Sequence, residues 1–160
     1  MPKWAERSPV AAAMLNPALI AAILAAAAED YRKESGRGMP WELAFIVSPL
    51  VLHRATREAL PSSIRTHLAN WISANPALHA GFPSRARNLT APIKEGLRFG
   101  LTHHILTLEG AVLLGQIKRP RGFSTPDELR DLLRPARLTG RWLSKADATS
   151  TVFALFGVAP

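Results

Sequence analysis

A long alanine-rich stretch near the start of the chain, "NPALIAAILAAAAEDY" at residues 16–31, limits the folds open to it. Its larger apolar side chains recur three or four positions apart, which places them on one face of an α-helix. Asn16 followed by Pro17 is typical of an N-cap and a first helical residue. The stretch therefore predicts an amphipathic helix that begins at residue 17, and it favours a mainly helical fold.

Two apolar segments resemble export or membrane signals. Lys3 and Arg7 precede the alanine-rich stretch as in a secretory signal, but the pair at 16–17 interrupts it. Residues 41–52, "WELAFIVSPLVL", contain Pro49 and are shorter than the roughly 20 residues that span a bilayer. We therefore expect neither a signal peptide nor a membrane span, and we interpret 41–52 as a buried core helix of a cytoplasmic protein.

The composition excludes several classes of protein and favours others. The 160 residues are the size of one domain, and the absence of cysteine excludes a disulfide scaffold, a cysteine-based zinc site and a thiol nucleophile. Twenty Lys+Arg against twelve Asp+Glu give a net charge of +8, which favours contact with polyanions. At 48% hydrophobic residues the chain is apolar for a small monomer, so part of this set could cover a partner.

Turn and cap residues mark further elements. Ser62 or Ser63 is predicted to cap a helix that runs to Ile72, and Ser84 caps a segment that Pro92 divides or kinks. Residues 106–114 read as a short β-hairpin around a Glu109–Gly110 turn.

The last part of the chain predicts two helices. Thr125, Pro126 and Glu128 form a capping box for a helix that continues to Leu143, bent near Pro135 and Gly140. A short apolar element, "TVFALFGV", follows a cap at Thr149 or Ser150 and ends at Gly157.

These elements predict a mainly α fold, a compact helical domain with one short β-hairpin. Residues 1–15 form an N-terminal arm, and 16–160 form a single helical domain. Within it, residues 62–118 have the helix, helix, hairpin order of a winged helix-turn-helix, with 85–105 as the second helix. A helical bundle with one added hairpin explains the same pattern equally well.

No group of residues indicates catalysis or metal binding. The five histidines, His53, His67, His79, His103 and His104, occur in no H-x-x-x-H or H-E-x-x-H pattern and have no acidic cluster beside them. The serines lack the G-x-S-x-G context of a nucleophile, and the glycines form no phosphate-binding loop. The sequence therefore predicts a protein that is not an enzyme and has no cofactor.

Basic residues are better organised than the acidic ones. One stripe, spaced four, three, four and four, consists of Arg130, Arg134, Arg137, Arg141 and Lys145. A secondary basic patch consists of Arg87, Lys94 and Arg98, with Lys118, Arg119 and Arg121 in the loop assigned to the wing. Such rows suit phosphates or the carboxylates of a partner protein. The alternative is a solvated helix face with local pairs, Asp127 to Arg130 and Asp131 to Arg134.

The end of the chain adds an apolar element beside the stripe. Phe153 and Phe156 follow a core that the earlier helices could already fill. Aromatic residues and arginine are enriched in protein interfaces. Residues 126–160 are therefore our candidate partner-docking surface.

Several motifs, taken in order, resemble a known family. They are "NPA" at 16–18, "FIVSPLVLH" at 45–53, "TREALP" at 56–61, "SSIRTHLANW" at 62–71 and "FALFGVAP" at 153–160. Together they look like the middle component of bacterial ABC-three-component systems, the group that contains the Lamassu anti-phage systems. Where that pattern has a proline before Thr56, this chain has Ala55.

The resemblance implies a non-catalytic adaptor that links an SMC/Rad50-like ABC ATPase subunit to an effector subunit, often a nuclease, with DNA contact through the complex. It also implies a structural joint between two helices, formed by Thr56, Arg57, Ser62, Arg65 and Trp71. The alternative from another class is a winged-helix transcriptional regulator that binds DNA with residues such as Arg85, Arg87 and Asn88.

Overall fold

The structure is a computed structural model that describes residues 8–118, 121–122 and 124–159. As predicted, it is mainly helical with a β-hairpin. The helices are α1 (Pro9–Met14), α2 (Pro17–Ser35), the 3-10 turn η2 (Trp41–Leu43), α3 (Ala44–Leu52), α4 (Arg54–Glu58), α5 (Leu68–Ala74), α6 (Pro76–Ala80), α7 (Phe82–Thr102), α8 (Asp127–Leu143) and α9 (Thr149–Phe156). The strands are β1 (Met39–Pro40), β2 (Leu106–Glu109) and β3 (Val112–Gly115).

Helix α2 lies at the centre of the domain and begins where the sequence predicts. The Asn16 side chain accepts a hydrogen bond of 2.8 Å from the Ala18 amide, and Gly36 closes the other end with a left-handed φ of 71°. Helices α3, α7 and α8 and strand β3 all pack against α2. The four alanines at 25–28 are fully buried, so the alanine run is the most enclosed part of the helix.

The alanine run is small because its neighbours approach its backbone. A Cβ atom added to Gly140 of α8 would lie 2.1 Å from the Ala27 carbonyl oxygen, and one added to Gly115 of β3 would lie 2.2 Å from that of Ala25. Both distances are far below van der Waals contact. Glycine and alanine therefore set how closely α8 and β3 lie against α2.

The hairpin belongs to a three-stranded antiparallel sheet of order β1-β3-β2. Strand β1 pairs Met39 with Leu113 and Pro40 with Val112, and thus brings an edge strand from before α3. This strand lies outside the 62–118 fragment that we assigned to a winged helix. The helix, strand, helix, helix, strand, strand order instead extends from α2 to β3, with α4, α5 and α6 inserted between α3 and α7.

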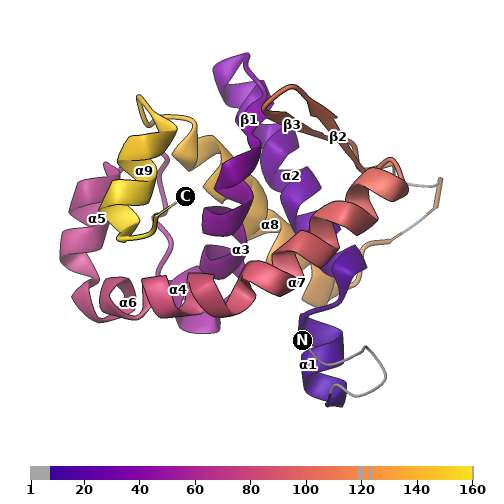
Figure 1. Cartoon of the computed structure of the whole chain (residues 1–160), viewed down its shortest axis with the longest axis horizontal. Coiled ribbons are helices and arrows are strands. Elements are labelled where there is room, and N and C mark those ends of the chain that lie inside the picture. The colour runs from indigo at the N-terminus through magenta and orange to yellow at the C-terminus, as the bar shows by residue number, and fades with distance from the viewer. Residues whose placement is uncertain (1–7, 119–120, 123, 160) are drawn as a thin grey trace.

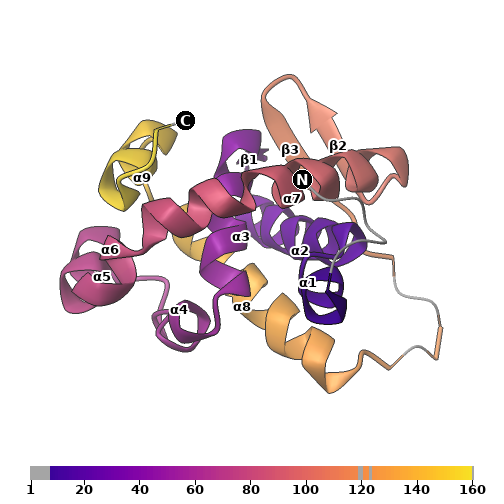
Figure 2. The same ribbon diagram turned by 60° about the horizontal axis from the view of Figure 1, so that its bottom comes forward.

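Helices α5, α6 and α9 gather at the end of the molecule opposite the sheet (Figures 1 and 2). An aromatic cluster holds this end to α7 and α8. The ring centroids of Trp71 and Trp142 lie 5.5 Å apart, and those of Phe82 and Phe156 lie 4.5 Å apart. The C-terminal element is thereby part of the core.

Three predicted helix starts are wrong. Helix α5 begins at Leu68 rather than beside Ser62 or Ser63, because residue 68 is the first side chain of that segment to be buried in the core. Helix α7 begins at Phe82, so Ser84 lies inside it. Helix α8 begins at Asp127 after an extended Pro126, whose carbonyl accepts the first helical bond from the Arg130 amide, so no capping box forms.

The remaining boundaries differ less from the predictions. Pro92 lies within α7 without dividing it, and α8 continues through Pro135 and Gly140. Gly157 ends α9 in a left-handed conformation, as predicted, although the N-cap of α9 is Ala148. Residues 9–14 of the predicted N-terminal arm form α1, and residues 1–7 lie outside the described part of the chain. Within that part, no helix combines the length and apolarity needed to cross a membrane.

Candidate partner-binding surfaces

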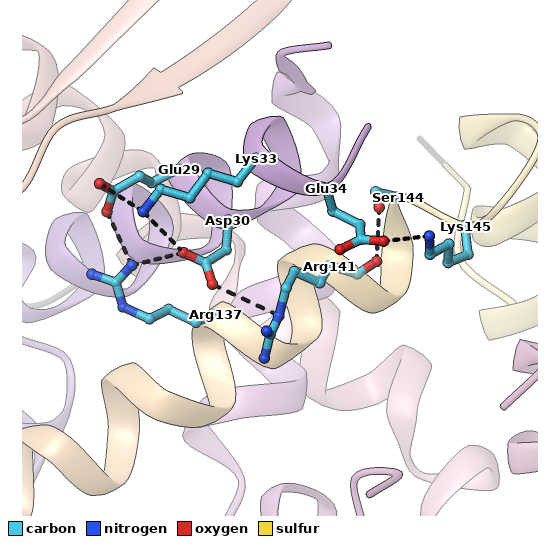
Figure 3. A network of polar contacts seen from close by, with 8 residues as sticks. All are labelled: Glu29, Asp30, Lys33, Glu34, Arg137, Arg141, Ser144 and Lys145. Atoms are coloured by element: carbon cyan, nitrogen blue, oxygen red, sulfur yellow. Dashed lines mark hydrogen bonds and ion pairs between the residues drawn. The ribbon is translucent and has the colours of Figure 1, made fainter. Parts of the chain in front are cut away.

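Much of the basic stripe on α8 faces acidic residues of α2 (Figure 3). Arg137 Nη1 donates to Asp30 Oδ1 at 2.7 Å and to Glu29 Oε2 at 3.0 Å. Arg141 Nε lies 3.7 Å from Asp30 Oδ2, and Lys145 pairs with Glu34. The sequence offered only local partners for the stripe, Asp127 and Asp131, whereas the acidic residues that pair with its second half come from a helix more than one hundred residues earlier.

The environment of Arg137 reinforces this contact. Burial lowers the pKa of Arg137, but hydrogen bonds and charge attraction from Asp30 and Glu29 outweigh it and raise the pKa above its usual value. The guanidinium keeps its charge at every accessible pH, since arginine is not deprotonated in proteins. Arg137 therefore stays charged and keeps its ion pairs between α8 and α2.

The first half of the stripe remains open to solvent. Arg130 pairs with Asp127 on its own helix, as the local alternative predicted. Arg134 is exposed and makes no ion pair with any described residue, so the expected pair with Asp131 is not formed. A hollow of about 610 Å³ opens here, lined by Asp30, Ser124, Thr125, Arg130, Leu133, Arg134, Arg137 and Arg141. Arg134 is thus the residue of the stripe without an ion-pair partner in the described part of the chain.

Phe153 and Phe156 are not exposed anchors, which corrects the interpretation from the sequence. Phe156 is completely buried between Phe82 and Trp71. Phe153 is 3% exposed. The core is not filled without α9, so the short apolar element at 151–158 contributes to internal packing.

The predicted joint between α3 and α5 is held by hydrogen bonds to backbone carbonyls. Arg57 Nη1 donates to Val51 at 2.6 Å, which ties α4 to the end of α3, and Trp71 Nε1 donates to Ala59 at 2.7 Å. Thr56 is fully buried, with its Oγ1 2.7 Å from His53 Nδ1. Ser62 and Arg65 are exposed, and neither side chain bonds to another described residue.

His53, which the sequence did not single out for this joint, caps α4. Its Nδ1 accepts from the Thr56 amide at 3.3 Å. Burial, followed by the positive charges of Arg85 and Arg57, lowers the pKa of His53 below its usual value. The neutral imidazole is therefore the form that the joint accommodates.

The secondary basic patch divides between two places. Arg87, Lys94 and Arg98 lie on the exposed side of α7, and within the described residues none of them has an ion-pair partner. Lys118 and Arg121 are exposed in the loop after β3 rather than at the hairpin turn, which carries Glu109. Arg119 lies outside the described residues. The hairpin turn therefore does not carry the basic residues that we assigned to a wing.

A groove of about 600 Å³ lies between the start of α3, the first half of α7 and the residues after α9. Its lining includes Trp41, Phe45, Ala86, Arg87, Lys94 and Val158. Trp41 is 38% exposed and meets Phe45 edge-on at 6.0 Å. The prediction that residues 41–52 form a buried core helix is wrong for Trp41, which is exposed and lines this groove. The adjacent Glu42 is the signal that the first turn reaches the surface.

Residues 4–160 match the family described as "ABC-three component (ABC-3C) system Middle Component 3". The chain belongs to this family. Neither curated proteins nor solved structures yielded a match. The match covers nearly the whole chain of this middle component, so the family extends over both ends of the fold.

The described part of this middle component holds no group of three or more His, Asp or Glu residues that could bind a metal ion. Its histidines have structural neighbours instead. His79 Nε2 bonds the Leu155 carbonyl at 2.8 Å, and the His103 ring packs on Phe99 at 4.2 Å. The middle-component family is not a known catalytic family, and membership implies association with the other components of such a system.

Proposed function

We propose that this middle component is the non-catalytic adaptor that links an SMC/Rad50-like ABC ATPase to an effector subunit, often a nuclease, in a cytoplasmic Lamassu-type antiviral complex. The match to the middle-component family over residues 4–160 carries the proposal. It is supported by the surface of the helical domain, which carries cations without ion-pair partners among the described residues and an open apolar groove.

The proposed partner contacts are the cations that α2 leaves free. Within regular elements we assign this role to Arg134 on α8 and to Arg87, Lys94 and Arg98 on α7, which are exposed and have no ion-pair partner among the described residues. Lys118, Arg121 and Arg65 extend this set in loops. Arg137, Arg141 and Lys145 contribute by fixing α8 on α2, so their role is to hold the surface in shape. When the whole complex binds DNA, its phosphates reach cations outside the groove beside Trp41, which are Arg98, Arg134, Lys118 and Arg121.

Co-expression with candidate ATPase and effector components of the same system tests the proposal. All three should co-purify, and omission of the middle component should release the effector from the ATPase. The isolated chain should neither hydrolyse ATP nor cut DNA. Retention of the effector by the ATPase without this chain would contradict the adaptor function, as would turnover that a point mutation in this chain abolishes.

A second candidate is the winged-helix regulator, which one observation favours. The helix and strand order from α2 to β3, with strand order β1-β3-β2, is that of a winged helix, and α7 in the recognition position exposes Arg87 and Asn88. The hairpin turn, however, carries Glu109, which repels phosphate.

A DNA titration at two salt concentrations separates the candidates. Weak, steeply salt-dependent binding by the isolated chain is expected of an adaptor that contacts phosphates. Nanomolar, sequence-selective binding that is insensitive to salt would favour the regulator.

A further inference from the structure

We propose that the groove beside Trp41 binds an acidic amphipathic segment of a partner component, with an apolar side chain of that segment against Trp41 and Phe45 and its carboxylates on Arg87 and Lys94. This inference rests on the proposed adaptor function and specifies which surface of the adaptor is used. Three properties of the groove support it: its apolar lining, its two cations and its single carboxylate.

Much of the lining of the groove is apolar, and part of it is exposed. Trp41 is one of two large hydrophobic residues exposed in the described chain. Its ring centroid lies 6.0 Å from that of Phe45, and both residues line the groove together with Phe153 and Val158. Tryptophan and arginine are the residues that most often dominate the binding energy of an interface. The groove combines both within one hollow of about 600 Å³.

The two cations that line the groove have no ion-pair partner among the described residues. Arg87 and Lys94 are seven positions apart on α7, which puts them on the same side of the helix two turns apart. Both are exposed, and neither pairs with an acidic residue of the described chain, in contrast to Arg137, Arg141 and Lys145. A partner helix or strand that places carboxylates at matching intervals would form charge-assisted hydrogen bonds with both.

The carboxylate of Glu42 argues against a nucleic acid as the ligand of the groove. Glu42 lines the same groove as Arg87 and Lys94. A phosphate backbone carries a negative charge at every residue and would meet Glu42 as well as the two cations. A protein segment can place its own carboxylates opposite α7 and an apolar or basic residue opposite Glu42. The apolar lining adds a contact that phosphates do not use.

A second copy of this chain fits the groove poorly. In a two-fold symmetric pair each copy presents the same patch, so the two cations Arg87 and Lys94 of one copy would meet a single carboxylate, Glu42, from the groove of the other. The net charge of +8 adds a general repulsion between copies. The occupant that satisfies the groove is therefore acidic and belongs to another protein.

Photo-cross-linking identifies the occupant directly. The photoreactive amino acid p-benzoylphenylalanine replaces Trp41 in the full chain, which is co-expressed with the ATPase and effector components and irradiated as the purified complex. Mass spectrometry of the cross-linked peptide should locate it in one of those components, in a segment that alternates apolar and acidic residues. A cross-link to a second copy of this chain, to DNA, or to a segment without acidic residues overturns the inference.

Charge reversal tests the cations against a matched control. Arg87→Glu with Lys94→Glu should weaken binding of the cross-linked component about tenfold or more, and lysine substitutions in its acidic segment should restore it. Arg32→Glu with Arg37→Glu reverses two other exposed cations that do not line the groove, and its effect should be several-fold smaller. Equal effects of the two changes would overturn the inference. If the complex assembles but position 41 yields no cross-link, the inference fails while the adaptor function stands; if no complex assembles, both fail.

Discussion

Arg137 on α8 donates a 2.7 Å hydrogen bond to Asp30 on α2, across 107 positions of sequence. The same guanidinium reaches Glu29, and Asp30 also lies 3.7 Å from both Lys33 and Arg141. Asp30 is 9% exposed, so its carboxylate depends on these cations rather than on water. The network joins the central helix to the helix that carries the basic stripe.

Replacement of Arg137 by alanine should therefore destabilise the domain. The loss of charge-assisted hydrogen bonds to a buried carboxylate costs about 1.5–3 kcal/mol of unfolding free energy. Urea denaturation followed by circular dichroism measures it. Arg130→Ala is the control, because Arg130 contacts Asp127 and the Thr125 carbonyl on an exposed surface, and its effect should stay within about 0.5 kcal/mol. Equal stability of the two variants would show that the α2–α8 network contributes nothing.

Gly140→Ala should destabilise the protein although alanine is the better helix former. The new Cβ would lie 2.1 Å from the Ala27 carbonyl oxygen, so α8 must move away from α2. Overpacking of this kind costs about 1–3 kcal/mol, whereas helix propensity alone would stabilise by up to ~1 kcal/mol. The sign of the change in thermal unfolding free energy decides between them. A more stable variant would mean that the two helices are less closely packed than described.

Trp71→Phe should weaken the joint and its aromatic cluster. The substitution removes the indole N–H that donates to the Ala59 carbonyl and leaves that carbonyl without this donor. We expect a loss of about 1–3 kcal/mol in chemical denaturation. Trp41→Phe makes the same chemical change at a 38% exposed site, where the effect should be under about 0.5 kcal/mol. A larger effect at position 41 would contradict the assignment of Trp41 to a binding surface.

The joint should also depend on pH through His53. Burial, then the positive charges of Arg85 and Arg57, lower its pKa in the folded state below the usual value of 6.5, so the unfolded chain binds the proton more readily. Stability from this site is complete above about pH 6.5 and is lost as the pH falls through the folded pKa. His53→Asn retains an oxygen that can cap α4 but does not titrate. The wild type should lose more stability than this variant between about pH 7 and pH 5. Equal losses in the two proteins would contradict a role of His53 in the pH dependence of the joint.

Short-range patterns in the sequence determined several elements correctly. Asn16 and Pro17 specify the start of α2, the spacing of its apolar residues specifies its helical conformation, and the Glu109–Gly110 turn specifies the hairpin. Each of these signals acts over a few residues, because caps, turns and helical periodicity are local interactions of the backbone. The absence of cysteine and of known catalytic motifs is likewise a property of the chain alone.

The tertiary structure determines which charged and apolar side chains are exposed at the surface. The acidic residues that pair with Arg137 and Lys145 lie 108 and 111 positions away, so no local pattern reveals that half of the stripe is internal. Phe156 is buried because Trp71 and Phe82 come from other helices, and Trp41 is exposed because no later element covers it. Whether an apolar or charged side chain is free depends on which distant residues the fold places against it, and periodicity within one helix contains no information on that.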